Sequence, residues 1–130
     1  MTEEMGLGLS QIEQIALTVQ DVERAVAFYQ TQLGMKHLFT SNGLAFFDCA
    51  GVRLMLSRPE GVDAAQASSI IYFKVEDIHR AYQMLSERSV KFEDKPHLIA
   101  NMGSYELWMV FFRDSEGNLL ALSGHELLSQ

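Results

Sequence analysis

Apolar and polar residues alternate in a short run near the start of the chain, and a helical pattern follows directly. Ile15, Leu17 and Val19 alternate with less apolar neighbours, which is the period-two pattern of a strand with two unlike faces. Asp21 suits a helix N-cap, because its carboxylate can accept from unpaired backbone N–H groups. Apolar residues at helical spacing continue over 22–33, so the sequence predicts a strand followed by a helix.

Three further strands are expected after this helix. The segments 37–41, 44–49 and 52–57 are rich in apolar residues and are bounded by turn residues. The dipeptide Asn42-Gly43 between the first two is typical of a tight hairpin turn. The later part of the chain predicts the same order of elements: a strand at 70–75, a helix at 78–85 capped by Asp77, and strands at 90–93, 106–113 and 118–123.

These two halves form an internal repeat. A shift of 56 positions aligns 19–25 with 75–81, and Val, Asp, Arg and Ala coincide. A shift of 66 positions aligns 46–57 with 112–123, where matching Phe, Asp, Gly, Leu and Ser residues coincide. The difference of ten between the two shifts implies an insertion in the second half. We expect it in a loop at 95–105, where Pro, Asn and Gly occur.

The repeat predicts an α+β protein of one domain, built from two tandem βαβββ modules at about 10–58 and 68–124. The residues before Leu9 and after His125 are expected to be loose tails. Each module has one helix for two sheet faces, so the helix covers the more apolar face and leaves the other without cover. Two such sheets can form a curved mixed sheet around a cleft, within one chain or between two chains.

The sheet face without a helix combines polar and apolar side chains, as small-molecule sites do. By strand alternation it carries Gln14, Ala16, Thr18, Arg53, Met55, Ser57, Ile70, Tyr72, Lys74, Leu119, Ala121 and Ser123. Arg53 could hold a carboxylate or phosphate; alternatively it reaches solvent or pairs with Glu60. Gln14 and Tyr72 could orient a ligand through hydrogen bonds, and Met55 is expected on the same face.

Composition and charge narrow the function further. The 130 residues are 48% hydrophobic and 21% charged, which is typical of a packed globular protein and not of a disordered one. The net charge of −7 argues against nucleic acid and anionic membranes as main partners, because both attract basic surfaces. A single cysteine, Cys49, and an acidic N-terminus without a signal-peptide pattern favour a cytoplasmic protein.

Two stretches of the sequence resemble the vicinal-oxygen-chelate superfamily. The first is 15–29 together with Leu33-Gly34, and the second is 112–118. This superfamily includes glyoxalase I, bleomycin and fosfomycin resistance proteins, and extradiol dioxygenases. The resemblance covers about 10–124 and implies a glyoxalase-like fold and, as in many members, a homodimer. It does not assign a reaction, because one fold can host many chemistries.

The resemblance also implies four metal-binding positions, which fall on Gln14, Met55, Ile70 and Ala121. The repeat agrees, since Gln14 matches Ile70 at a shift of 56 and Met55 matches Ala121 at a shift of 66. Divalent metals in such sites need oxygen, imidazole or thiolate ligands. Only Gln14 offers one, because Ile70 and Ala121 carry no donor and the Met55 thioether is too soft. We therefore expect no metal at these positions and no other cofactor.

The favoured hypothesis is a protein that binds a small hydrophobic or aromatic molecule in a metal-free cleft. Trp108, Phe47 and Tyr72 are aromatic residues that could stack on such a ligand. The face of Trp108 is not assigned, because its segment 105–112 shows no clear alternation. The expected partners are this small molecule, as ligand or substrate, and a second copy of the chain.

Three alternatives stay open. The first is a metal-dependent lyase or dioxygenase of the same superfamily, which would require a different set of ligands. The second is a metal-free enzyme that uses side chains such as His97, Arg53 or Glu106. His97 is the candidate general base, because it follows Pro96 at the edge of the expected loop and an imidazole titrates near neutral pH. The third is a scaffold protein that binds no ligand.

Overall fold

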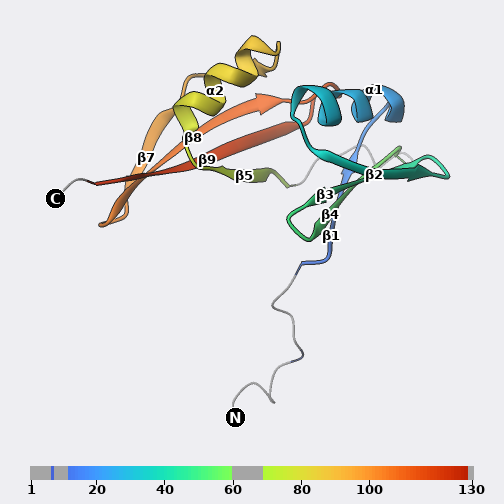
Figure 1. Cartoon of the computed structure of the whole chain (residues 1–130), viewed down its shortest axis with the longest axis horizontal. Helices are drawn as coiled ribbons and strands as arrows, with labels where there is room; N and C mark the ends of the chain where they lie inside the picture. The colour runs from blue at the N-terminus through green and yellow to red at the C-terminus, as the bar shows by residue number, and fades with distance from the viewer. Residues whose placement is uncertain (1–6, 8–11, 60–68, 129–130) are drawn as a thin grey trace.

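Two β-sheets, each with one helix on the same side, make up the molecule (Figure 1). The computed structural model describes residues 7, 12–59 and 69–128. The first module consists of β1 (Gln14–Thr18), α1 (Val22–Ala27), the π-helix η2 (Phe28–Gln32), β2 (Lys36–Ser41), β3 (Leu44–Cys49) and β4 (Val52–Ser57). The second consists of β5 (Ile71–Val75), α2 (Ile78–Glu87), β6 (Lys91–Phe92), β7 (His97–Asn101), β8 (Tyr105–Arg113) and β9 (Leu119–Leu127).

The sheets have the same mixed topology, which confirms the predicted α+β fold with two βαβββ modules. Sheet A has the strand order β1-β4-β3-β2, and sheet B has the order β5-β9-β8-β6 with β7 also paired to β8. In each sheet the first strand of the module runs parallel to the last, and the other pairs are antiparallel. No helix among the described residues is long and apolar enough to cross a membrane.

Both helices begin where the sequence predicts. The Asp21 carboxylate accepts a hydrogen bond of 3.0 Å from the backbone N–H of Arg24. Asp77 accepts in the same way from the N–H of Arg80, at 3.1 Å. Each aspartate therefore satisfies a donor in the first turn of its helix, which would otherwise have no partner within the helix.

The first helix ends differently from the prediction. One α-helix was expected over 22–33, but α1 stops at Ala27 and η2 follows as a π-helix. The N–H of Leu33 donates to the carbonyl of Phe28, five residues earlier, at 3.0 Å. This wider turn places two consecutive aromatic side chains, Phe28 and Tyr29, in the core.

The insertion is a strand pair and not the expected loop at 95–105. β7 and the first part of β8 form a hairpin, in which His97 pairs with Met109 and Asn101 pairs with Glu106. β9 continues beside this hairpin to Leu127, because its backbone groups pair with the added part of β8. The strand includes Glu126 and Leu127, so the prediction of a loose tail directly after His125 is wrong.

The core lies between the helices and one face of each sheet. In sheet A it contains Leu54 and Leu56, and in sheet B it contains Phe112, Leu120 and Leu122. The residues that alternate with them point to the other face. Burial thus confirms the predicted assignment of alternating strand residues to the helix-facing side and the other side of each sheet.

Side chains on the helix side connect the two modules, and we call Arg24, Tyr29, Asp114 and Glu116 the inter-module clamp. The hydroxyl of Tyr29 donates to Oδ2 of Asp114 at 2.7 Å, and both residues are buried. The Arg24 guanidinium donates twice to the Glu116 carboxylate, at 2.7 and 2.9 Å. The β8–β9 turn of the second module is thereby held against α1 of the first.

The Glu116 side chain of this clamp is almost fully enclosed, with only 1% of it exposed. Besides the two bonds from Arg24, it accepts from the backbone N–H groups of Gln20 and Asp21, at 2.9 and 3.0 Å. The hydrogen bond from Arg24, followed by those backbone donors, lowers the pKa of Glu116 to about 2 against the opposing effect of burial. The carboxylate is therefore ionised in the folded protein at neutral pH.

Candidate ligand-binding faces

The face of sheet A that points away from α1 carries a cluster of polar and apolar side chains. We call Gln14, Phe46, Arg53 and Met55, together with Phe39, the open face of sheet A. α1 contacts β3 and β4 from the other side, where the alternating residues of those strands are buried. No helix among the described residues covers this second face, since α2 packs on β8 and β9.

Gln14 and Met55 are brought together by the parallel pairing of β1 with β4. The amide nitrogen Nε2 of Gln14 lies 3.8 Å from the sulfur of Met55, in hydrogen-bond geometry. In the same register Gln14 pairs with Arg53. Three of the predicted site residues are therefore neighbours on one face.

Arg53 lies over an aromatic ring on this face. Its guanidinium carbon is 5.8 Å from the ring centre of Phe46, and Nη2 lies 3.3 Å from the carboxylate of Glu13. Its Nε is buried and has no hydrogen-bond partner among the described residues. The alternative partner, Glu60, lies outside the described residues.

Two phenylalanines that were not selected from the sequence complete the open face of sheet A. The rings of Phe39 and Phe46 lie 4.7 Å apart, and Phe39 is 49% exposed. A register shift in β2 between His37 and Phe39 brings Phe39 opposite Phe46. Phe47, which was expected to stack on a ligand, is instead fully buried against Tyr29 on the helix side. The expectation for Phe47 is therefore wrong.

Tyr72 lies on the corresponding face of sheet B. It is 48% exposed, and its ring meets the edge of Phe111 at 5.9 Å. Across the β5–β9 pair it is opposite Ala121, which is fully buried. The aromatic partner of Tyr72 thus belongs to sheet B. The contacts of Gln14, Arg53 and Met55 are with residues of sheet A, and Arg53 also contacts Glu13, which directly precedes β1.

Trp108 lies on the opposite side of sheet B, with the helix. It packs against the core, and its ring is 5.1 Å from that of His79 in α2. It pairs with Gly124, where a Cβ atom would come within 2.7 Å of Ile78, so α2 approaches this part of the sheet closely. The structure thus separates Trp108 from the other predicted ligand-binding residues.

His97 lies on β7, at the edge of sheet B. Its Nδ1 is 3.1 Å from the backbone carbonyl oxygen of Lys95. Among the described residues no carboxylate lies within ion-pair distance of the ring, so the backbone carbonyl of Lys95 is the group that can orient it. The role of His97 stays a prediction.

The four positions implied for a metal do not provide a suitable set of ligands. Gln14 and Met55 are adjacent, but they offer an amide and a thioether. Ile70 and Ala121 offer no donor at all. Within the part of the chain that the structure describes, no three His, Cys, Asp or Glu side chains group closely enough to hold a metal. The donor chemistry therefore does not fit a hard divalent ion at this place.

Comparison with known families agrees with this fold and topology. The family described as Glyoxalase/Bleomycin resistance protein/Dioxygenase superfamily matches residues 11–122. The chain belongs to this superfamily. The match spans both modules, so the superfamily expected from the resemblance of the opening and closing segments is confirmed.

Individual relatives support the same assignment. The uncharacterized protein YraH of Bacillus subtilis (strain 168) is 31% identical over 123 residues, which cover 84% of this chain and 94% of that protein. A lactoylglutathione lyase from Agrobacterium tumefaciens has a similar structure, with a TM-score of 0.75, 22% identity, and coverage of 90% of this chain and 95% of its own. A superfamily member from Sphaerobacter thermophilus has a TM-score of 0.75, 23% identity and coverage of 91% and 99%. At these identities the two structures support the fold alone.

Proposed function

We propose that the chain binds a small hydrophobic or aromatic molecule on the open faces of its sheets, without a metal. The observation that carries this proposal is the group of Phe39, Phe46 and Arg53 on a face that neither α1 nor α2 covers. Exposed apolar surface bordered by polar groups is a common feature of ligand-binding sites. The two rings offer a stacking surface, and the Arg53 guanidinium offers donors to a carboxylate or another acidic substituent.

Gln14 and Met55 would orient and enclose the ligand beside these rings. The Gln14 amide has both donors and an acceptor, and its present contact is a long one to sulfur. A ligand with a hydrogen-bonding group can replace that weak contact by a stronger one. The thioether of Met55 is polarisable and adapts to aromatic surfaces of different shapes.

A homodimer is the second part of the proposal. Ile70, directly before β5, and Tyr72 in β5 are more than one third exposed, as is Phe39 on sheet A. A second copy of the chain would cover these faces and convert two open surfaces into an enclosed cleft, and twofold pairs are the commonest closed assemblies. Light scattering after size exclusion should give twice the chain mass of 14.7 kDa. A monomer at micromolar concentration would contradict this part of the proposal.

The single free cysteine, Cys49, suits a reducing compartment, and we place the protein in the cytoplasm on that basis. Fractionation of cells that express the untagged chain would test this location. Recovery with periplasmic or secreted proteins would contradict it.

The ligand site can be tested with an aromatic sulfonate, 8-anilinonaphthalene-1-sulfonate, and methionine labelled with ¹³C in its methyl group. The Met55 resonance should shift in a saturable way, because its side chain lies on the open face of sheet A. Phe46→Ala should weaken binding at least about tenfold, the effect of losing a stacking contact. Leu98→Ala, at an exposed apolar residue of β7 in sheet B, is the matched control and should bind normally. A Met55 signal that does not respond to the probe would contradict the proposed site.

A further inference from the structure

We propose a second binding site, on the helix side between the two modules, for a small aliphatic carboxylate. A cavity of about 270 Å³ lies there, between α2, sheet B and the segment that leads from η2 to β2. It is lined by Leu33, Met35, Phe73, Val75, Ala81, Met84, Leu85, Arg88, Phe112 and Leu122. Leu33 and Met35 come from the first module and the others from the second, so neither module forms this cavity alone.

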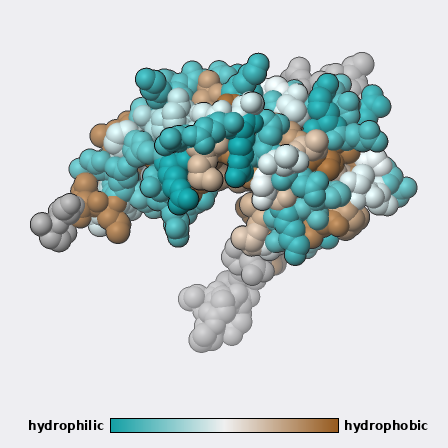
Figure 2. All heavy atoms as spheres, turned by 45° about the horizontal axis from the view of Figure 1, so that its top comes forward, coloured by the Kyte–Doolittle hydropathy of each residue, from teal (hydrophilic) through white to brown (hydrophobic). Residues whose placement is uncertain are grey.

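The lining combines an apolar interior with one charged group. Nine of the ten lining residues are apolar, and Arg88 is the cation among them. An apolar cavity with few polar groups at its border is the usual form of a site for a small organic molecule. The surface that carries the helices is mainly hydrophilic, and more hydrophobic residues are visible between the two modules (Figure 2). The chemistry of the lining therefore favours an amphiphile with an acidic head group.

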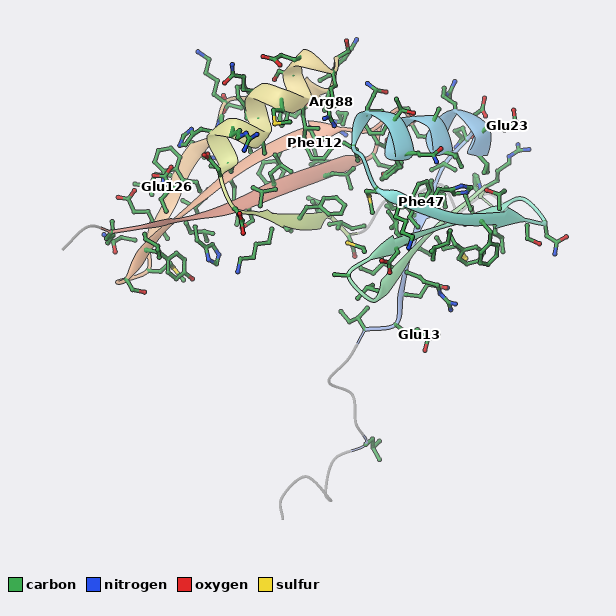
Figure 3. All side chains as sticks on the ribbon, viewed as in Figure 1. Glu13, Glu23, Phe47, Arg88, Phe112 and Glu126 are labelled. Atoms are coloured by element: carbon green, nitrogen blue, oxygen red, sulfur yellow. The ribbon has the colours of Figure 1, made fainter. Side chains whose placement is uncertain are left out.

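The Arg88 guanidinium has donors available for such a head group. Arg88 lies at the end of α2, on the side of Phe112 and of the first module (Figure 3). Its Nη1 donates to the backbone carbonyl of Gln32 at 3.3 Å. Among the described residues, the Arg88 guanidinium forms no ion pair. The adjacent carboxylate of Glu87 accepts from Gln83 instead. A guanidinium has five N–H donors, so a carboxylate can bind to the remaining ones as a bidentate pair.

Two side-chain-to-backbone hydrogen bonds hold Arg88 in this place. The side-chain amide Nε2 of Gln32 donates to the Arg88 carbonyl at 2.8 Å, while the Arg88 guanidinium donates to the Gln32 carbonyl. These two bonds fix the end of α2 against the end of η2, so the guanidinium is positioned at the cavity before any ligand arrives. Little ordering of the protein is then needed for binding, which favours affinity.

The volume limits the length of the ligand. At the packing density of protein interiors, 270 Å³ holds roughly 200 Å³ of ligand atoms, which corresponds to an unbranched acid of roughly eight to ten carbons. Its tail would contact Phe73 and Phe112 from sheet B and Met84 from α2. Longer acids would have to leave part of the tail in solvent, so affinity should stop rising beyond this length.

This site is independent of the proposed function, because it lies on the helix side of the sheets. The same ¹³C-methionine labelling separates the two, since Met35 and Met84 line the cavity and Met55 lies on the open face of sheet A. Decanoate, kept below the concentration at which it forms micelles, should shift Met35 and Met84 in a saturable way and leave Met55 unchanged. A shift of Met55 alone would overturn this inference while supporting the open-face site.

Variants of Arg88 test the head group. Arg88→Gln should weaken decanoate binding at least about tenfold, because the charged bidentate pair is lost, whereas Arg88→Lys keeps the charge without the planar fork and should restore only part of the affinity. Arg80→Gln, which removes an arginine of α2 that does not line the cavity, is the control and should bind as the natural chain does. Decanol should bind both Arg88→Gln and the natural chain equally. Equal decanoate affinity for the natural chain and Arg88→Gln, or no saturable shift of Met35 and Met84, would overturn the inference.

Discussion

The Glu116 carboxylate lies 2.7 Å from Nε of Arg24, so a turn of the second module caps the first helix of the first module. The contact joins residues that are 92 positions apart in the sequence. It lies beside the second contact of the clamp, in which Tyr29 donates to Asp114. The clamp provides charged and buried polar contacts at one border between the modules, and their loss should reduce stability in measurable ways.

Replacing Glu116 by glutamine should lower the free energy of unfolding by about 2 kcal/mol, after allowance for the solvent around the exposed Arg24. The amide keeps the shape of the side chain but removes the charge that Arg24 and the two backbone N–H groups bind. Urea unfolding at pH 7 measures the change. Glu93→Gln, which removes an ion pair with Arg113 that is half exposed on both sides, should cost less than about 0.5 kcal/mol. Equal losses in both variants would contradict the role of the clamp.

The Glu116 contribution should depend on acid pH in a defined window. Its pKa is about 2 in the folded protein, against 4.5 for an ordinary glutamate. A lowered folded pKa means that the stability is present above pH 4.5 and is lost as the pH falls toward 2. The difference in unfolding free energy between the natural chain and Glu116→Gln should therefore shrink from pH 5 to pH 2. A difference that stays constant over this range would show that the charge is not the source of the effect.

Tyr29→Phe should lower the unfolding free energy by about 1.5 kcal/mol, because the Asp114 carboxylate loses one buried donor. Burial, and then the charge of Asp114, raise the pKa of Tyr29 well above its ordinary value of 10. A raised folded pKa means that this stability is present below pH 10 and is lost as the pH rises above it. Thermal unfolding at pH 7 and pH 11 measures both effects. Tyr82→Phe, whose ring packs on Phe92, is the control and should change little.

The assignment of β4 residues to the buried face and to the open face of sheet A can be tested with two neighbouring substitutions. Leu54→Asp should cost about 4 kcal/mol or more, because Leu54 is 3% exposed in the core and an unpaired charge there has no solvent. Met55→Asp, one position further and on the open face of sheet A, should cost much less. Circular dichroism melting of both variants would show the contrast. Natural-like melting of Leu54→Asp would mean that the two faces of β4 are inverted.

The mapping of the four implied metal positions can be tested by adding ligands. Met55→Glu with Ile70→His supplies a carboxylate and an imidazole where the chain has a thioether and an alkyl group. The double variant should bind nickel or zinc at least about tenfold more tightly than the natural chain, by isothermal calorimetry. Met55→Leu with Ile70→Val is the control without donors. Natural-level affinity in the first variant would argue against the mapping.

Much of the fold could be predicted because its signals are local. Alternation around Leu54 and Leu56 identified the core face of a strand, and Asp21 and Asp77 marked the helix starts. The π-helix could not be predicted in this way, since the residues 28–32 satisfy the apolar spacing of an ordinary helix. The inserted hairpin was missed because Pro96, directly before it, and Gly103, in its turn, are typical of loops.

The candidate site was predicted only where strand parity was clear. Gln14, Arg53 and Met55 lie together because β1 and β4 alternate cleanly and pair in parallel. Trp108 belongs to the segment 105–112, in which every residue is at least partly buried. The burial pattern therefore does not assign Trp108 to a face of the sheet, and only its pairing with β9 does so. The clamp depends on contacts such as Tyr29 with Asp114, which are 85 positions apart and leave no periodic signal.

The clamp also distinguishes the two halves of the duplication. The position that matches Glu116 in the first module is Ala50, and the position that matches Tyr29 in the second is Leu85. α2 therefore meets no equivalent turn, and each chain contains one such contact, satisfied internally. The duplication is therefore used unequally at this border: the helix residues come from the first module and the turn residues from the second. Two copies of either module alone would lack one set of partners for this contact.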